Sequence, residues 1–414
     1  MSARETWLKF RLPALVCGAL LLLGYARTAP GTQHTAPWGY RNWSFSALAY
    51  SDILALHEDR GGGRHAFPYF EDKVEYPVLL GLGMWWPSVV APSRAGYFAV
   101  TYAALALSAL AVLWLLCALP GTQPWAWAAS PALLVYVPLN WDLFGILPLV
   151  AGLFLWARGH TRWAALALGI AVWAKFFPVI ALGVLVLFTT RRSLRAALEM
   201  LAIFAAVTLA VNLPFALPLA SRKNWLWFFE YNKIRDLEPS LYLLLGAHPR
   251  SFVPMANLIS AGVSLCAALA VTVVELRTRR TRSLDAFRVC CALVCIFFAA
   301  NKVFSPQYWL WVVALLALAG TPGWLAAATG FMALTDFLVS FAFLHLQQSR
   351  AGALTTWFDG ALFVPMVWSR YAFLGGCAFW AAWNPSGSSF SNPFSSSSGQ
   401  SLQTKPSQAA DPAV

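Results

Sequence analysis

The chain has 414 residues, of which 59% are hydrophobic and only 11% are charged. Soluble domains carry about 25% charged residues, so the composition excludes an ordinary soluble protein and predicts an all-α polytopic membrane protein. The net charge of +12 comes from Arg and Lys clustered between apolar runs, a pattern that suits contact with anionic membrane lipids. A nucleic-acid partner is not expected, because it would call for basic patches on a polar, soluble module.

The chain opens with Arg4, Lys9 and Arg11 before an apolar run, as a signal peptide also does. No convincing cleavage pattern follows, so we expect a retained first span over Leu12–Thr28. A membrane helix needs about 20 apolar residues. The other runs of this length are Tyr97–Leu119, Ala196–Pro214, Phe252–Leu276 and Leu325–Leu346. Shorter runs are Trp125–Leu139, Asp142–Ala157, Val289–Val303, Gln307–Gly320 and Gly360–Trp383. Together with the segments below, these predict about 10–12 transmembrane helices.

A long polar loop, residues 50–77, follows the first span. Asp52 begins a predicted short amphipathic helix in this loop. A carboxylate at the membrane interface can accept a proton from an attacking hydroxyl, as a general base does; the alternative is a helix cap or a solvated acid. Glu75 and Tyr76 precede the apolar run Pro77–Ala91, which we expect to be re-entrant or interfacial. A glutamate there also suits a helix N-terminus, so its purely structural reading stays open. Arg64 and His65 are further candidates for lining a substrate cavity.

Charged residues also occur inside the apolar runs. Asp142 lies between two short runs, and a charge at bilayer depth costs about 2.5–3.5 kcal/mol on insertion scales. The run Trp163–Thr189 is interrupted by Lys175 and Pro178 and has basic residues on both sides, which predicts a hairpin of two short helices. The Lys175 ammonium could hold a lipid-borne phosphate. The alternative is a buried ion pair with Asp142 or Asp336.

A second polar segment, Asn301–Tyr308, separates two later apolar runs and offers Lys302, Gln307 and Tyr308 as candidate site residues. It can equally be an ordinary interfacial loop. The stretch Arg222–Arg235 mixes basic and aromatic residues and suits an interfacial loop near lipid head groups; contact with an anionic substrate is the secondary alternative. The basic loops are expected in the cytoplasm, which places these polar segments on the outer face.

Residues 384–414 are rich in Ser, Pro, Gly and Gln and predict a disordered cytoplasmic tail after a membrane domain of residues 1–383. His57, Glu58 and Asp59 are adjacent, but adjacent residues of a helix point in different directions. No zinc-ligand spacing occurs in the sequence, so no metal and no other cofactor are expected.

The order of these motifs resembles the GT-C membrane glycosyltransferases. The motifs are Ser-Asp-Ile at Asp52, Glu-Tyr-Pro at Glu75, Asn-Trp-Asp at Asp142, Ala-Lys-Phe-Phe-Pro at Lys175 and Asn-Lys-Val-Phe-Ser-Pro-Gln-Tyr at Lys302. Within GT-C they look like glycosyltransferase family 87, whose bacterial members include polyprenol-phosphate-mannose-dependent mannosyltransferases. The resemblance covers residues 1–383.

The resemblance implies inverting transfer from a polyprenyl-phosphate sugar to a lipid-linked or glycan acceptor at the outer face of a bacterial cytoplasmic membrane. Asp52 matches the position of the family's catalytic aspartate. Lys175 and Lys302 would neutralise the departing phosphate. The first loop lacks the paired Asp-x-Asp of metal-using relatives. The main alternative is a transporter or flippase for a polyprenyl-linked or anionic lipid, and a third reading is a membrane scaffold without catalysis.

Overall fold

The protein is built from helices, as its composition predicts. The computed structural model describes residues 2–34, 38–59, 65–246, 250–277 and 286–383, and these residues form no β-strand. The chain is therefore an all-α, multi-pass membrane protein. The predicted tail, residues 384–414, and the candidate site residue Arg64 lie outside the described residues.

Six helices of the described part are long and apolar enough to cross a membrane. Five correspond to the long predicted spans, with ends shifted by a few residues: α1 (Ala3–Thr28), α5 (Arg94–Cys117), α11 (Leu194–Ala216), α14 (Val253–Arg277) and α17 (Gly323–Gln348). The sixth covers Ala353–Trp383. It consists of α18 (Ala353–Phe358), a π-helical turn (Asp359–Phe363) and α19 (Val364–Trp383).

Six shorter apolar helices complete the membrane part: α4 (Val78–Val90), α8 (Leu143–Ala157), α9 (Thr161–Ala174), α10 (Val179–Thr190), α15 (Ala286–Ala300) and α16 (Tyr308–Leu318). At about 1.5 Å per residue, none of them reaches the roughly 30 Å of a hydrocarbon core. Within the described residues, a single one of these helices is thus too short to cross the hydrocarbon core alone.

The predicted hairpin at Lys175 is present. α9 ends at Ala174, Lys175 is extended (φ −152°, ψ 119°), and α10 begins after Pro178. Proline has no backbone N–H and stiffens the chain where the helix breaks. The break places the Lys175 side chain at the end of the hairpin, away from the basic loops.

Two predicted elements differ in the structure. The run Trp125–Leu139 forms two short helices, α6 (Pro124–Ala128) and α7 (Pro131–Tyr136). The Ser130 side chain caps α7 by accepting a hydrogen bond from the Ala132 N–H, and Pro131 cannot continue the preceding helix. The stretch Arg222–Arg235 is not a loop but most of a helix, α12 (Leu219–Ile234).

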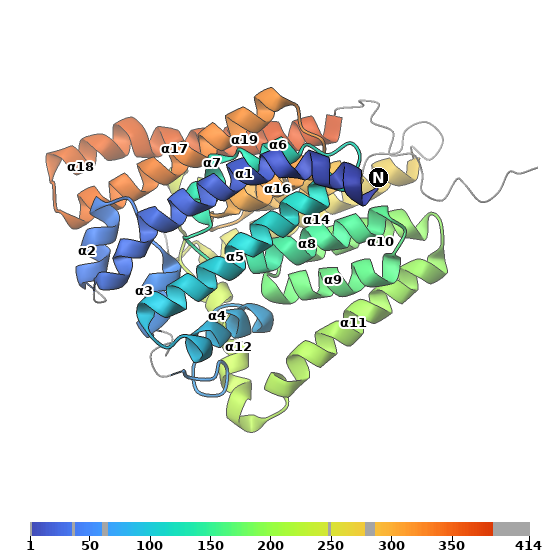
Figure 1. The fold of residues 1–414 in the computed structure, drawn as a ribbon, viewed down its shortest axis with the longest axis horizontal. Coiled ribbons are helices and arrows are strands. Elements are labelled where there is room, and N and C mark those ends of the chain that lie inside the picture. Colours follow the sequence, from blue (N-terminus) through green and yellow to red (C-terminus); the bar gives the residue numbers. More distant parts are fainter. Residues whose placement is uncertain (1, 35–37, 60–64, 247–249, 278–285, 384–414) are drawn as a thin grey trace, which may run out of the picture.

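The remaining elements lie at one end of the bundle. They are a 3₁₀ turn (Ala29–Gln33), α2 (Trp38–Ser46), α3 (Asp52–Asp59) and α13 (Leu241–Leu244). α2 and α3 lie at the end of the bundle opposite the N-terminus, with α4 and α12 below them (Figure 1). At the other end, Arg158 donates to the Ala118 carbonyl, and Cys117 donates to the Lys9 carbonyl. The basic loop at Arg158 therefore lies at the same end of the bundle as the N-terminal basic residues.

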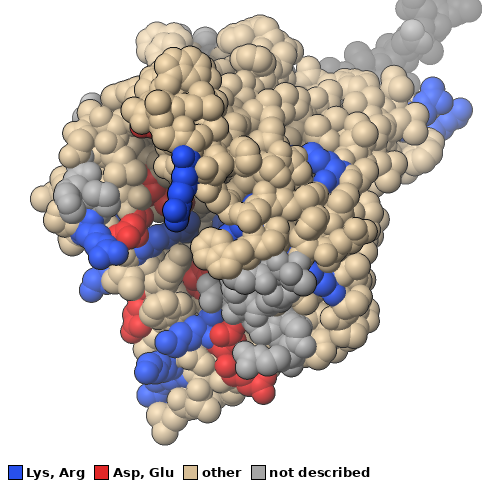
Figure 2. All heavy atoms as spheres, turned by 90° about the vertical axis from the view of Figure 1, so that its left-hand side faces the viewer, with Lys and Arg blue, Asp and Glu red and all other residues tan. Residues whose placement is uncertain are grey.

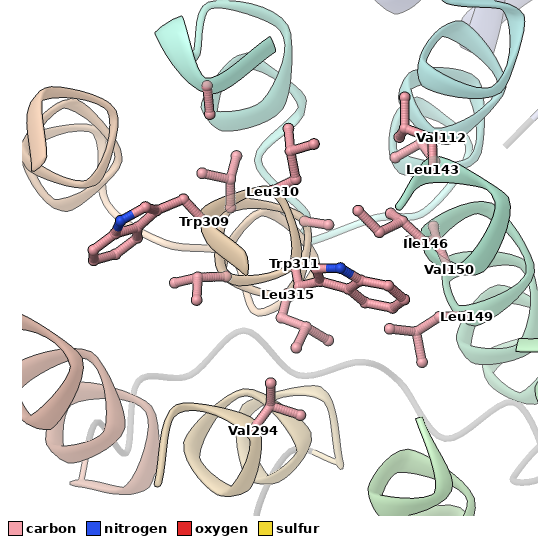
Figure 3. Close-up of a cluster of buried hydrophobic side chains, with 14 of the residues drawn as sticks. Val112, Leu143, Ile146, Leu149, Val150, Val294, Trp309, Leu310, Trp311 and Leu315 are labelled. Atoms are coloured by element: carbon pink, nitrogen blue, oxygen red, sulfur yellow. The ribbon is translucent and has the colours of Figure 1, made fainter. Parts of the chain in front are cut away.

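α16 runs through the middle of the core. All of its residues from Trp309 to Leu318 are buried. Seen along its axis in Figure 3, Trp309 and Trp311 point to opposite sides, and Trp311 lies toward Ile146 and Val150 of α8. Each indole donates to a buried carboxylate: Trp309 to Asp336 at 2.8 Å and Trp311 to Asp142 at 2.7 Å. The core helix thus fixes two acids in the interior of the bundle.

Candidate functional site

A cavity of about 970 Å³ brings together most of the predicted site residues. Asp52, Glu75, Tyr76, Lys175, Gln307 and Tyr308 all line it, although they come from four separate segments of the chain. Its remaining wall is largely aromatic and aliphatic, with side chains from α12, α15 and α17. Figure 2 shows that charged side chains of both signs gather on the lower part of the face at this end of the molecule, while most of the surface above them is uncharged.

Asp52 is held in the wall by hydrogen bonds to the segment before α8. Its backbone N–H donates to the Leu139 carbonyl at 2.7 Å, and the neighbouring Ser51 hydroxyl donates to the Pro138 carbonyl at 2.5 Å. The Asn140 amide donates to Asp52 Oδ2 at 2.7 Å. The other end of that amide is fixed, because Asn140 Oδ1 accepts the Trp141 N–H at 2.7 Å. Two segments far apart in sequence therefore set the orientation of this carboxylate.

The surroundings of Asp52 raise its pKa above the ordinary value. Burial is the main cause, since it disfavours the charged carboxylate. Hydrogen bonds from Asn140 and Tyr50 and the charge of Lys175 act in the opposite direction. The same carboxylate contributes, after burial, to raising the pKa of Tyr76 well above its usual value. A carboxylate with a raised pKa that faces a cavity suits a group that accepts a proton.

Lys175 forms a buried ion pair with Asp142, one of the two partners that the sequence allowed. Its ammonium lies 3.1 Å from Asp142 Oδ1, and Asp142 is completely buried. Asp142 does not line the cavity, so it acts on the site through Lys175. The ammonium also lies 5.2 Å from the centre of the Tyr76 ring and 6.0 Å from that of Tyr308. Lys175 is therefore both paired and in contact with the cavity.

Lys302 occupies a different place from the one predicted. Its ammonium donates to the Asn232 carbonyl at 2.8 Å and the Lys233 carbonyl at 3.3 Å, and the side chain is not part of the cavity wall. A cation bound to the last carbonyls of a helix stabilises its C-terminus, here that of α12. Burial, and then the charge of Arg235, lowers the pKa of Lys302 to about 8.

His65 also lies away from the cavity. It is exposed, and its backbone carbonyl accepts a hydrogen bond from the Trp85 indole at 3.0 Å. Two candidates close to Lys302, Gln307 and Tyr308, line the cavity, and so do Asn301 and Ser305 of the same segment. The structure thus gathers six of the ten candidate residues, while Asp142, Lys302 and His65 lie behind or beside the wall.

Three charged residues of the wall were not among the candidates: Arg235, Glu238 and Arg370. Arg235 and Glu238 form an ion pair just after α12. Arg370 of α19 pairs with Asp336 of α17, and both side chains are buried. The sequence offered a signal for this second pair, since an arginine and an aspartate inside apolar helices call for partners.

Comparison with known protein families, characterised proteins and solved structures finds no match for this chain.

Proposed function

We propose that the protein is an inverting, polyprenyl-phosphate-sugar-dependent glycosyltransferase of the GT-C type, similar to family 87. The transferred sugar in this proposal is a hexose, mannose by the commonest family assignment, and the acceptor is a lipid-linked or glycan hydroxyl. The reaction takes place at the outer face of a bacterial cytoplasmic membrane, opposite the basic loops.

The observation that carries the proposal is the Asp52 carboxylate in the wall of the cavity. Asn140 orients it, burial raises its pKa, and Lys175 lies close enough to affect that pKa. Ligand pockets commonly measure about 300–1,000 Å³, and a cavity of about 970 Å³ is at the upper end of this range. Such a volume suits two substrates that must meet.

In the proposed reaction Asp52 removes the proton of the acceptor hydroxyl. The acceptor oxygen attacks the anomeric carbon on the side opposite the phosphate, and the bond from that carbon to the phosphate oxygen breaks. Its electron pair leaves with the phosphate, so the configuration inverts. Cations in the wall, Lys175 among them, stabilise the charge that develops on the phosphate. Lys302 supports the reaction indirectly, by holding the end of α12.

A lipid transporter remains the second candidate, because of the hairpin at Lys175. Discontinuous helices with charged residues at their broken ends mark substrate paths in secondary transporters, and α9 and α10 meet at such a break. A transporter needs no general base. Replacing Asp52 by Asn therefore separates the two functions.

The test uses purified full-length protein with radiolabelled polyprenyl-phosphate mannose and a membrane lipid extract. Wild type is expected to transfer label to a new glycolipid or glycan. Asp52→Asn is expected to lower the rate by about 10²–10⁴-fold, the usual contribution of general-base catalysis. Glu230→Gln is the matched control, because Glu230 is exposed on α12 and does not line the cavity.

Equal transfer by wild type and Asp52→Asn would move the base to another carboxylate, with Glu75 next in the wall. No transfer by a folded wild-type protein would contradict this donor and favour the transporter.

A further inference from the structure

Among the described residues, three cations line the cavity: Lys175, Arg235 and Arg370. Each is paired with a carboxylate, Asp142, Glu238 and Asp336 respectively. An anionic ligand can bind one of these cations only by adding to its pair or by displacing the partner. The three pairs differ in how easily the carboxylate can leave.

Two of the carboxylates are fixed. Asp142 and Asp336 are both 0% exposed. Asp142 accepts a hydrogen bond from the Trp311 indole N–H. Asp336 accepts one from the Trp309 indole N–H and another from the Ser340 hydroxyl at 3.1 Å. Displacing either acid would leave a charge unpaired in the core, which is strongly unfavourable. Lys175 and Arg370 therefore keep their partners.

Glu238 is different. Its side chain is 36% exposed and lines the cavity, and that of Arg235 is 27% exposed. Two nitrogens of Arg235, Nε and Nη2, donate to the same oxygen of Glu238. A phosphate presents several oxygens, so it can take the two donors separately in the fork geometry that arginine favours. Partly exposed ion pairs also contribute little to stability.

The backbone around this pair is anchored on both sides. Lys302 holds the end of α12 through the Asn232 and Lys233 carbonyls. Arg370 donates to the Pro239 carbonyl at 3.0 Å, and the Glu238 N–H donates to the Lys302 carbonyl at 3.3 Å. Arg235 thus stays at the cavity wall when the Glu238 side chain rotates away.

We propose that Glu238 occupies the place of a phosphate on Arg235, and that the phosphate of a lipid-borne donor displaces the Glu238 carboxylate when it enters the cavity. Arg235 is then the exchangeable anion-binding residue of the site. The inference depends on the proposed function only for the chemistry of the ligand, an isoprenyl phosphate.

The test measures binding to full-length protein in phosphatidylcholine nanodiscs by calorimetry. The probes are farnesyl phosphate, inorganic phosphate and uncharged farnesol. Glu238→Gln is expected to raise the affinity for farnesyl phosphate about two- to fivefold, because it removes the partly exposed ion pair that competes with the phosphate. Arg235→Gln is expected to lower this affinity about 10- to 100-fold through the loss of charge-assisted hydrogen bonds. In the Arg235→Gln background, Glu238→Gln is expected to have no further effect.

Glu230→Gln and Lys223→Gln are the matched controls, since both residues are exposed on α12 and outside the cavity wall. They are expected to leave the affinity unchanged, and farnesol is expected to bind all variants equally. Arg235→Lys keeps the charge and, with gel filtration, shows whether a loss of binding reflects misfolding.

Four outcomes would overturn the inference. The first is that Glu238→Gln leaves the affinity for farnesyl phosphate unchanged, and the second is that it changes this affinity even in the Arg235→Gln background. The third is that Glu230→Gln changes the affinity as much as Glu238→Gln does. The fourth is that Glu238→Gln raises the affinity for inorganic phosphate only. The transfer assay is read separately. A Glu238 effect without sugar transfer would contradict the proposed donor, favour the transporter and keep the phosphate site, whereas transfer without a Glu238 effect would refute this inference alone.

Discussion

A carboxylate works as a base near neutral pH when its pKa lies closer to the working pH than that of a free aspartate. The pKa of Asp52 is raised by burial, while the Asn140 hydrogen bond limits the rise by favouring the charged form. Burial and the hydrogen bond from Asn140 thus change the pKa of Asp52 in opposite directions.

The first prediction concerns the pH dependence of transfer. The acid limb of the rate profile is expected to have its midpoint above the usual aspartate value of 3.8, because only ionised Asp52 accepts a proton. Asn140→Leu removes a donor to the ionised form and is expected to shift this midpoint to higher pH. An unchanged midpoint would mean that Asp52 does not control the limb.

The same shift has a consequence for stability. Since the folded-state pKa is raised, Asp52 contributes stability below its unfolded-state pKa, and this contribution is lost as the pH rises through the folded-state pKa. At neutral pH the charged carboxylate therefore carries a stability cost. Such a cost is common where a side chain is kept for function rather than for packing.

The second prediction concerns the buried pair of Asp142 and Lys175. Asp142→Asn leaves the Lys175 ammonium without its partner at 3.1 Å and is expected to lower the free energy of unfolding by about 3–5 kcal/mol. Thermal unfolding in detergent measures the effect. Glu199→Gln, which breaks exposed pairs with Arg162 and Arg195, is the control and should change little. Equal effects would show that burial does not govern the Asp142 pair.

At the scale of elements, the close approach of α8 and α16 positions the site. A Cβ atom at Gly145 of α8 would lie 2.7 Å from the Trp311 ring and 3.3 Å from the Lys175 Cβ atom. Glycine is needed here because a rigid indole, itself bonded to Asp142, occupies the space. A change in the spacing of α8 and α16 would therefore shift the Lys175 side chain directly.

The third prediction tests this contact. Gly145→Ala is expected to destabilise the protein by about 1–3 kcal/mol through overpacking and to lower the rate of transfer. Gly183→Ala in α10 is the matched control, because nothing lies within 4 Å of its added methyl group. It is expected to stabilise by about 0.5–1 kcal/mol. Similar thermal unfolding of the two variants would contradict the packing argument.

At the scale of the whole molecule, the bundle separates a basic end from the end that carries the cavity. Arg158 lies at the same end of the bundle as the N-terminal basic residues, and the hairpin at Lys175 reaches from that end toward the cavity. Positive loops stay in the cytoplasm, so the cavity is expected to open outward.

The fourth prediction tests this orientation with two exposed histidines, His65 near the cavity end and His160 in the basic loop. Each is replaced by cysteine in a Cys266→Ser background, since Cys266 is exposed. A membrane-impermeant maleimide on intact spheroplasts is expected to label position 65, and position 160 only after permeabilisation. The reverse pattern would place the cavity in the cytoplasm.

Much of the fold was predictable from the sequence because membrane helices follow a local rule. About 20 apolar residues make a span, and the long runs correspond to α1, α5, α11, α14 and α17. The break at Lys175 was equally local, since it follows from Pro178 and from basic residues on both sides. The two errors, at Trp125–Leu139 and Arg222–Arg235, arose where an apolar run contained a serine–proline cap and where a helix carried mixed polar and aromatic residues.

By itself, the sequence determined that this is an all-α membrane protein with a polar first loop, and which charged residues lie in apolar surroundings. Only the tertiary structure decided their partners: Asn140 with Asp52, Asp142 with Lys175, Asp336 with Arg370, and two carbonyls of α12 with Lys302. The reason is physical. Burial of a charge is a property of the local run, whereas its partner is chosen by helices that pack together from distant parts of the chain.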